Sequence, residues 1–172
     1  MATLQPWHDF FLLTGTAAAT LLGLVFVAGS IAASIPNEKL GDDPTRALWV
    51  LPIVYAFVRV LVVSAIGVVP GEKPNTFGWL LLGLSSFDLA RMATVFWGMR
   101  RHHRVREPLE WSDWTWYLAY PTVATILIAI SGGILALHDE LPPTLLALGL
   151  IGHLVMGVHN AWALVDWLAT RQ

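Results

Sequence analysis

Five ionisable side chains fall within stretches of sequence that are otherwise apolar. They are Arg59 in YAFVRVLVV, Asp88 and Arg91 in SSFDLARMAT, and His153 and His159 in GHLVMGVHNAW. An ionised group at the centre of a bilayer costs about 2.5 to 3.5 kcal/mol, so such residues must face protein or water, and they are candidates for ion pathways and proton transfer. We therefore take these five residues as the candidate functional site.

Asp88 and Arg91 are three residues apart, which makes them neighbours on one helix face and lets them neutralise each other. Arg59 then needs a partner from another helix, and Asp88 is the only carboxylate expected at its depth. Two arginines that share one aspartate leave a positive excess, which a neutral histidine, a carbonyl group, water or a bound anion can absorb. The pattern fits two interpretations, an interhelical salt bridge that fixes register and a functional polar site.

The two histidines are expected on different faces of one helix. At 100° per residue, His153 shares a face with Asn160, whereas His159 lies about 120° away. The two imidazoles therefore cannot bind one haem or one metal ion within a single helix. Histidine can relay protons near neutral pH; the alternative is that each imidazole hydrogen-bonds a neighbouring helix.

The elements that carry these residues are predicted to be transmembrane helices. Of 172 residues, 56% are hydrophobic and 13% are charged, against about 25% charged in an ordinary soluble domain. A helix needs about 20 mostly apolar residues to span a bilayer, and five segments are long enough. They lie near residues 10–35, 45–69, 77–99, 115–137 and 144–168. The connections are short, so we expect a single transmembrane domain, residues 1–172, folded as an all-α bundle in which consecutive helices run antiparallel. Pro121 and the pair Gly132–Gly133 could kink the fourth segment.

Basic residues gather at one set of helix ends. If the loop RRHHRVREPLE is cytoplasmic, seven of the ten Lys and Arg residues fall inside, one falls outside and two are within helices. This bias predicts an external N-terminus and an internal C-terminus. Most of the nine tryptophans fall near helix ends, where amphipathic aromatic residues meet the membrane interface. The net charge of -2 is the sum of opposed local biases, so the expected partner is the lipid bilayer and not nucleic acid.

The first segment carries a stripe of small or hydroxyl-bearing residues, broken only by valine, at spacings of three and four. Its members are Thr16, Thr20, Gly23, Val27, Ser30 and Ser34. Such a stripe allows close helix packing, either within the chain or against another subunit. The alternative is the lining of a narrow pore that conducts through hydroxyl groups and water. We expect a homo-oligomer, because five short helices are too few to enclose a generous pathway.

Motifs typical of enzymes are absent from the sequence. It contains no HExxH, GxSxG, P-loop or glycine-rich dinucleotide fingerprint. It also has no cysteine, which excludes thiolate metal sites, and the adjacent His102 and His103 point to different sides of a helix. We therefore expect no catalytic activity and no metal site.

Two stretches, FFLLTGTAAATLLGLVFVAGSI and GVHNAWALVDW, resemble small, functionally unassigned integral-membrane proteins of bacteria. This resemblance covers both ends of the chain and implies a location in the bacterial inner membrane, but no activity. The stretch TLLGLVFVAG is also similar to the pore helix of Orai calcium channels in its glycine, bulky residue and valine. The acidic selectivity residue of that family has no counterpart here, since Ser30 and Ile31 occupy the matching region.

Our principal hypothesis is an oligomeric channel or transporter that moves an ion or small solute past a polar site at the midplane. In it Asp88 responds to the ion or proton, Arg59 and Arg91 set its charge state, and His153 or His159 relays protons. No bound cofactor is expected under this hypothesis. The alternatives are a haem- or quinone-binding membrane subunit, with histidine ligands contributed across a subunit interface, and a structural or regulatory membrane partner without transport.

Overall fold

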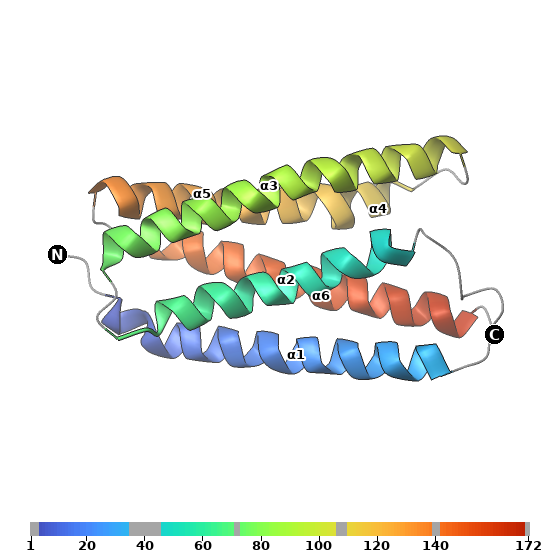
Figure 1. The fold of residues 1–172 in the computed structure, drawn as a ribbon, viewed down its shortest axis with the longest axis horizontal. Helices are drawn as coiled ribbons and strands as arrows, with labels where there is room; N and C mark the ends of the chain where they lie inside the picture. Colours follow the sequence, from blue (N-terminus) through green and yellow to red (C-terminus); the bar gives the residue numbers. More distant parts are fainter. Residues whose placement is uncertain (1–3, 35–45, 71–72, 106–109, 139–141, 171–172) are drawn as a thin grey trace.

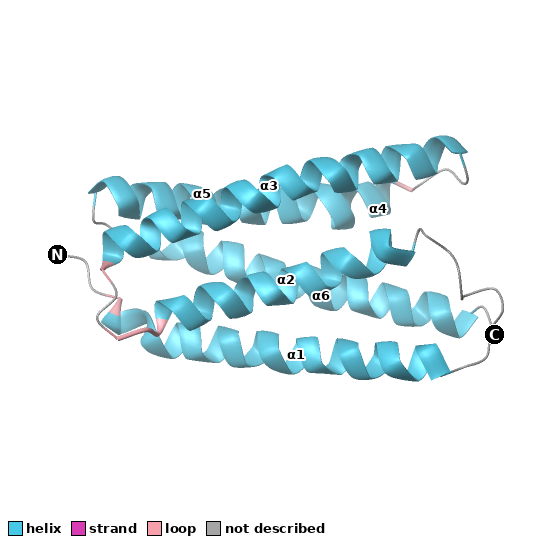
Figure 2. Cartoon of the chain, in the orientation of Figure 1, coloured by secondary structure: helices cyan, strands magenta, loops and turns pink. Residues whose placement is uncertain are grey.

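The computed structural model describes residues 4–34, 46–70, 73–105, 110–138 and 142–170, and helices make up nearly all of this part of the chain (Figures 1 and 2). The elements are η1 (Gln5–Trp7), α1 (His8–Ser34), α2 (Arg46–Gly67), α3 (Pro74–Val105), α4 (Trp111–Trp114), η2 (Thr115–Ala119), α5 (Tyr120–His138) and α6 (Pro143–Thr170). Five helices are long and apolar enough to cross a membrane, with α4, η2 and α5 together forming one of them. The predicted all-α class is therefore confirmed, and five helices in the described part of the chain are able to span a membrane, which is the predicted number.

Prolines begin two of the long helices. Pro74 is the first residue of α3 and Pro143 is the first residue of α6. Proline suits this position because its fixed φ is helical and its missing N–H has no partner there anyway. The helix α3 extends beyond both ends of the predicted span 77–99, and its last turns carry a cluster of basic residues.

The fourth span contains a π turn beside Pro121. The N–H of Tyr120 bonds to the carbonyl of Thr115, five residues earlier, and Thr115–Ala119 form the π-helical element η2. A proline inside a helix offers no N–H to the preceding turn and crowds it, and a wider turn accommodates both effects. The irregularity expected at this proline is thus a π turn.

The order of helices in space differs from their order in the chain. Packing runs from α1 to α2, from α2 to α6, from α6 to α5 and from α5 to α3. Figure 1 shows α3 and α5 side by side at one side of the bundle, α1 at the opposite side, and α2 and α6 between them. The consecutive helices α2 and α3 contact each other only slightly. We call this region of slight contact the α2–α3 seam.

Glycines lie at each of the four well-packed interfaces. A Cβ atom added to any of these glycines would contact the neighbouring helix. At the α1–α2 interface Gly15 faces Ser64, and at the α2–α6 interface Gly157 faces Phe57. At the α5–α6 interface Gly149 faces Ile128, and at the α3–α5 interface Gly78 faces Ala136. At Gly78 the approach is backbone to backbone, since a Cβ there would lie 2.5 Å from the Ala136 nitrogen. Small residues stabilise helix pairs in a bilayer by allowing this proximity.

The stripe predicted on the first helix faces away from the rest of the chain. The side chains of Thr16, Thr20, Val27 and Ser30 are exposed, and a Cβ on Gly23 would meet nothing within 4 Å. The Thr20 and Ser30 hydroxyls donate to carbonyls of their own helix at 2.9 Å. The Ser34 side chain lies outside the described part of the structure. Packing within the chain therefore does not account for this stripe.

Candidate functional site: a charged network between α2 and α3

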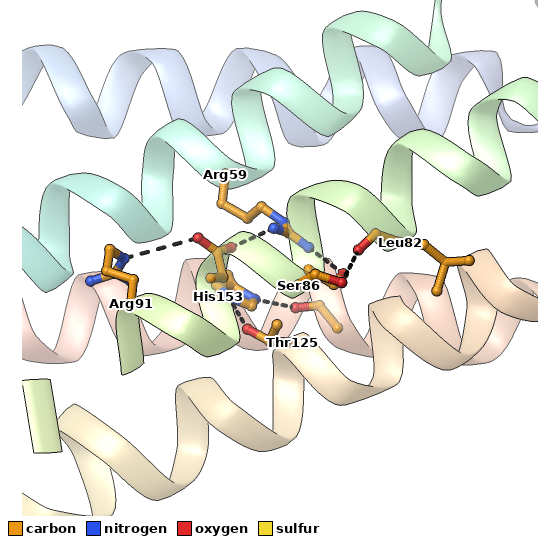
Figure 3. A network of polar contacts seen from close by, with 9 residues as sticks. Arg59, Leu82, Ser86, Arg91, Thr125 and His153 are labelled. Atoms are coloured by element: carbon orange, nitrogen blue, oxygen red, sulfur yellow. Dashed lines mark hydrogen bonds and ion pairs between the residues drawn. The ribbon is translucent and has the colours of Figure 1, made fainter. Parts of the chain in front are cut away.

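An ion pair bridges the α2–α3 seam (Figure 3). Arg59 on α2 donates from Nη1 to Oδ2 of Asp88 on α3, and from Nη2 to the Ser85 hydroxyl at 2.7 Å. Ser85 and Asp88 are three residues apart, so α3 presents both acceptors on one face. The side chains of Arg59 and Asp88 are only 4% and 10% exposed. The structure thus gives Arg59 the interhelical carboxylate that its depth requires.

Arg91 is attached to this pair more loosely. Its Nε lies 3.9 Å from Oδ1 of Asp88, which is too far for a hydrogen bond. Its guanidinium instead lies over the ring of Tyr55 on α2, 4.1 Å from the ring centroid, an arrangement that stabilises a desolvated cation. The Arg91 N–H groups donate no hydrogen bond within the described part of the chain. The Arg91 side chain is therefore held by the charge of Asp88 and by the face of the Tyr55 ring.

The network carries an excess of positive charge. Arg59 and Arg91 contribute two guanidinium charges, and Asp88 contributes one carboxylate. The guanidinium Nε of Arg59 is buried and has no hydrogen-bond partner among the residues described. The arrangement is therefore not neutralised by its own members, as the residue types had indicated.

His153 lies between α5 and α6 and is 3% exposed. Its Nδ1 is 2.9 Å from the Gly149 carbonyl, and because a carbonyl can only accept, Nδ1 carries a proton. Its Nε2 is 3.4 Å from the Thr125 hydroxyl, which can donate to a neutral imidazole. A neutral imidazole therefore satisfies both contacts. Figure 3 shows His153 and Thr125 alongside the network.

His159 is not part of this constellation. Its ring stacks on the indole of Trp116, with centroids 3.7 Å apart and an interplanar angle of 11°. Its Nδ1 lies 3.2 Å from the side-chain oxygen of Asn160, and the residue is exposed. The two histidines thus lie on different faces of α6, as the helical spacing predicted, and only His153 accompanies the charged residues.

Asn160 donates a hydrogen bond to the π turn of the fourth span. The carbonyl of Trp116 would pair with the N–H of residue 121 in that turn, but residue 121 is a proline. The Asn160 amide donates to this carbonyl at 3.2 Å from α6, and the side chain is fully buried. A buried carbonyl without a donor costs about 1 to 3 kcal/mol, so Asn160 ties α6 to η2.

The comparisons with known proteins identify no relative. No protein-family model, curated protein or solved structure matches this chain. Among the described residues, no three His, Cys, Asp or Glu side chains come together as a metal site. The functional proposal below is therefore built on the geometry of the charged network.

Three members of the site were not identified from the sequence. Ser85 lies one helical turn before Asp88, and that spacing was a usable signal. Tyr55 carried no such signal, because it contacts Arg91 on another helix. Thr125 carried no such signal, because its role depends on α5 packing against α6.

Proposed function

We propose that the chain is a multi-pass membrane protein that moves an ion or small solute across a bilayer through the polar site of Arg59, Asp88, Arg91 and His153. One observation carries the proposal: Arg59 and Asp88 are buried well inside α2 and α3, with the half-buried Arg91 beside them, at the seam where these helices otherwise contact little. Apolar side chains at this seam would avoid an insertion cost of about 2.5 to 3.5 kcal/mol per charge. A role in transport accounts for that cost. Asp88 acts as the ion- or proton-responsive group, and the arginines set its charge state.

The proposed setting is a bacterial inner membrane, with the N-terminus outside and the C-terminus inside. Its support is the exposed basic cluster of Arg100, Arg101 and Arg104 at the end of α3. In Figure 1 this end lies on the same side of the bundle as the end of α1, the beginning of α2 and the end of α6. Basic residues at cytoplasmic helix ends favour this orientation.

A homo-oligomer assembled through α1 is part of the proposal. Only 17% of the apolar window of α1 is buried inside the chain, and the stripe around Gly23 faces outward. In the oligomer this stripe packs against, or lines a pore with, the same stripe of other copies. We expect Gly23→Leu to abolish cross-linked oligomers. Gly29→Leu is the matched control, because Gly29 is equally open and lies about 120° from the stripe. Equal oligomers in both variants would contradict assembly through this face.

Proteoliposomes test the transport proposal directly. Proton and potassium fluxes are measured for the wild type, Asp88→Asn, Ser85→Ala and His159→Ala, after all four are shown to insert and elute alike. We expect Asp88→Asn to abolish flux and Ser85→Ala to reduce it, because both alter the acceptors of Arg59. His159→Ala should retain flux, since His159 contacts Trp116 and Asn160 and not the network. Absence of any ion flux from well-folded wild type, across pH and voltage, would refute transport.

A structural role is the second candidate, and the direct bonding of Arg59 to Asp88 favours it. In this role the pair fixes the register of α2 against α3, and Asp88→Asn damages assembly without any transport defect in the molecules that still assemble.

The haem-subunit hypothesis places a ligand such as the exposed His159 at a subunit interface. A Soret band in the visible spectrum of the purified protein would support that hypothesis instead.

A further inference from the structure

We propose that the charged network binds a small monovalent anion, and that carboxylates suit it best. This inference names the class of solute for the site of the proposed function, and so rests on that function for its biological meaning. Binding itself is measured without transport.

The charge balance of the network calls for one more negative charge. Two guanidinium groups face a single carboxylate at the α2–α3 seam. An unbalanced charge away from water is costly, and His153 adds no negative charge, because its contacts are those of a neutral imidazole. One bound monovalent anion brings the site to neutrality, whereas a divalent anion would overshoot it.

Hydrogen-bond donors are available for that anion. Arg91 presents the five N–H groups of a guanidinium, and none of them donates to the described part of the chain. Tyr55 occupies one face of its guanidinium plane, which leaves the edges, where N–H groups point, for a ligand. A planar fork of N–H donors matches the two oxygens of a carboxylate.

Burial limits the size of the ligand. The Arg91 side chain is 14% exposed and that of Asp88 is 10% exposed, so only a small anion reaches the free N–H groups without displacing the helices. These constraints lead to formate as the probe, with chloride as a monovalent anion that lacks two oxygens.

The experiment follows the thermal unfolding of the purified protein in detergent as formate replaces methanesulfonate, a bulkier monovalent anion without a carboxylate, at constant ionic strength. A ligand that binds the folded state raises the midpoint in a saturable way. The variants are Arg91→Gln, which removes the charge, and Arg91→Lys, which keeps the charge but not the planar fork. Arg100→Gln is the matched control, because it is the same substitution on an exposed arginine of the same helix.

We expect a saturable rise for the wild type and for Arg100→Gln, at least about tenfold weaker affinity for Arg91→Lys, and no rise for Arg91→Gln. Chloride should bind the wild type more weakly than formate. No saturable rise in the wild type, or equal affinity in the Arg91→Lys variant, would overturn the proposal even if Arg91→Gln does not fold. Equal affinity for chloride would overturn the preference for carboxylates. Saturable formate binding in a protein that conducts no ion supports the anion site while refuting the transport function.

Discussion

Replacing Asp88 should lower the free energy of unfolding more than replacing its ion-pair partner Arg59. In Asp88→Leu both arginines stay charged without any carboxylate, and breaking a buried pair in this way costs about 3 to 5 kcal/mol. In Arg59→Met the aspartate keeps Arg91 at 3.9 Å. The main loss is then the charged hydrogen bonds to Asp88 and Ser85, and we expect about 2 to 3 kcal/mol.

The double variant Arg59→Met with Asp88→Leu should be more stable than Asp88→Leu alone. It removes one positive and one negative charge, so the net charge of the network stays that of the wild type, and apolar side chains replace a buried ion pair at little cost. We expect the double variant within about 2 kcal/mol of the wild type. The coupling energy between the two sites is then at least about 3 kcal/mol, at or above the upper end for residues in contact.

Equilibrium unfolding in mixed micelles, followed by tryptophan emission, measures this cycle. All four proteins are unfolded with increasing fractions of a denaturing detergent, and refolding is checked from both directions. Strict additivity of the two single costs in the double variant would refute the pairing of Arg59 with Asp88. Arg59→Met costing more than Asp88→Leu would refute the part assigned to Arg91.

Two further predictions concern helix packing. Gly78→Ala should destabilise the protein by about 1 to 3 kcal/mol, because its Cβ would lie 2.5 Å from backbone of α5 that cannot move aside. The control Gly83→Ala, on the same helix with nothing within 4 Å, should be neutral or slightly stabilising; unfolding midpoints that fall equally would contradict the close α3–α5 contact. Asn160→Ala should cost about 1 to 3 kcal/mol by stripping the Trp116 carbonyl of its donor, and less in a Pro121→Ala background, where the backbone regains an N–H. An undiminished cost in that background, measured by the same unfolding transition, would show that Asn160 acts in another way.

The membrane spans and the charged residues could be predicted from sequence because each depends on local properties. Hydropathy over about 20 residues identifies a span whatever it packs against. The spacing of Asp88 and Arg91, and the lack of another carboxylate at the depth of Arg59, were enough to indicate the pair that the structure contains.

The choice of helix neighbours could not be predicted in this way. Lipid is as apolar as the side chains, so hydrophobicity does not tell which helix faces which. The packing of α3 on α5, which places Gly78 against Ala136, left no periodic signal that distinguishes it from packing on α2. The contact of His153 with Thr125 and the bond from Asn160 to the π turn follow from this neighbour order, and therefore stayed hidden.

The same neighbour order divides the molecule into positions that tolerate different kinds of change. At three of the glycine-lined interfaces the limit is volume, because a Cβ would meet backbone atoms at Gly78 and Gly149 and the Phe57 ring at Gly157 at less than 3.0 Å, and a larger side chain there displaces its neighbours whatever its polarity. At the α2–α3 seam charge is a further limit, because the Arg59 and Asp88 side chains are buried there and a change in the sum of charges leaves a charge without a partner. Destabilised variants in a random library should therefore fall into two groups. One group is rescued by a second substitution that restores side-chain volume, and the other by a second substitution that restores the sum of charges.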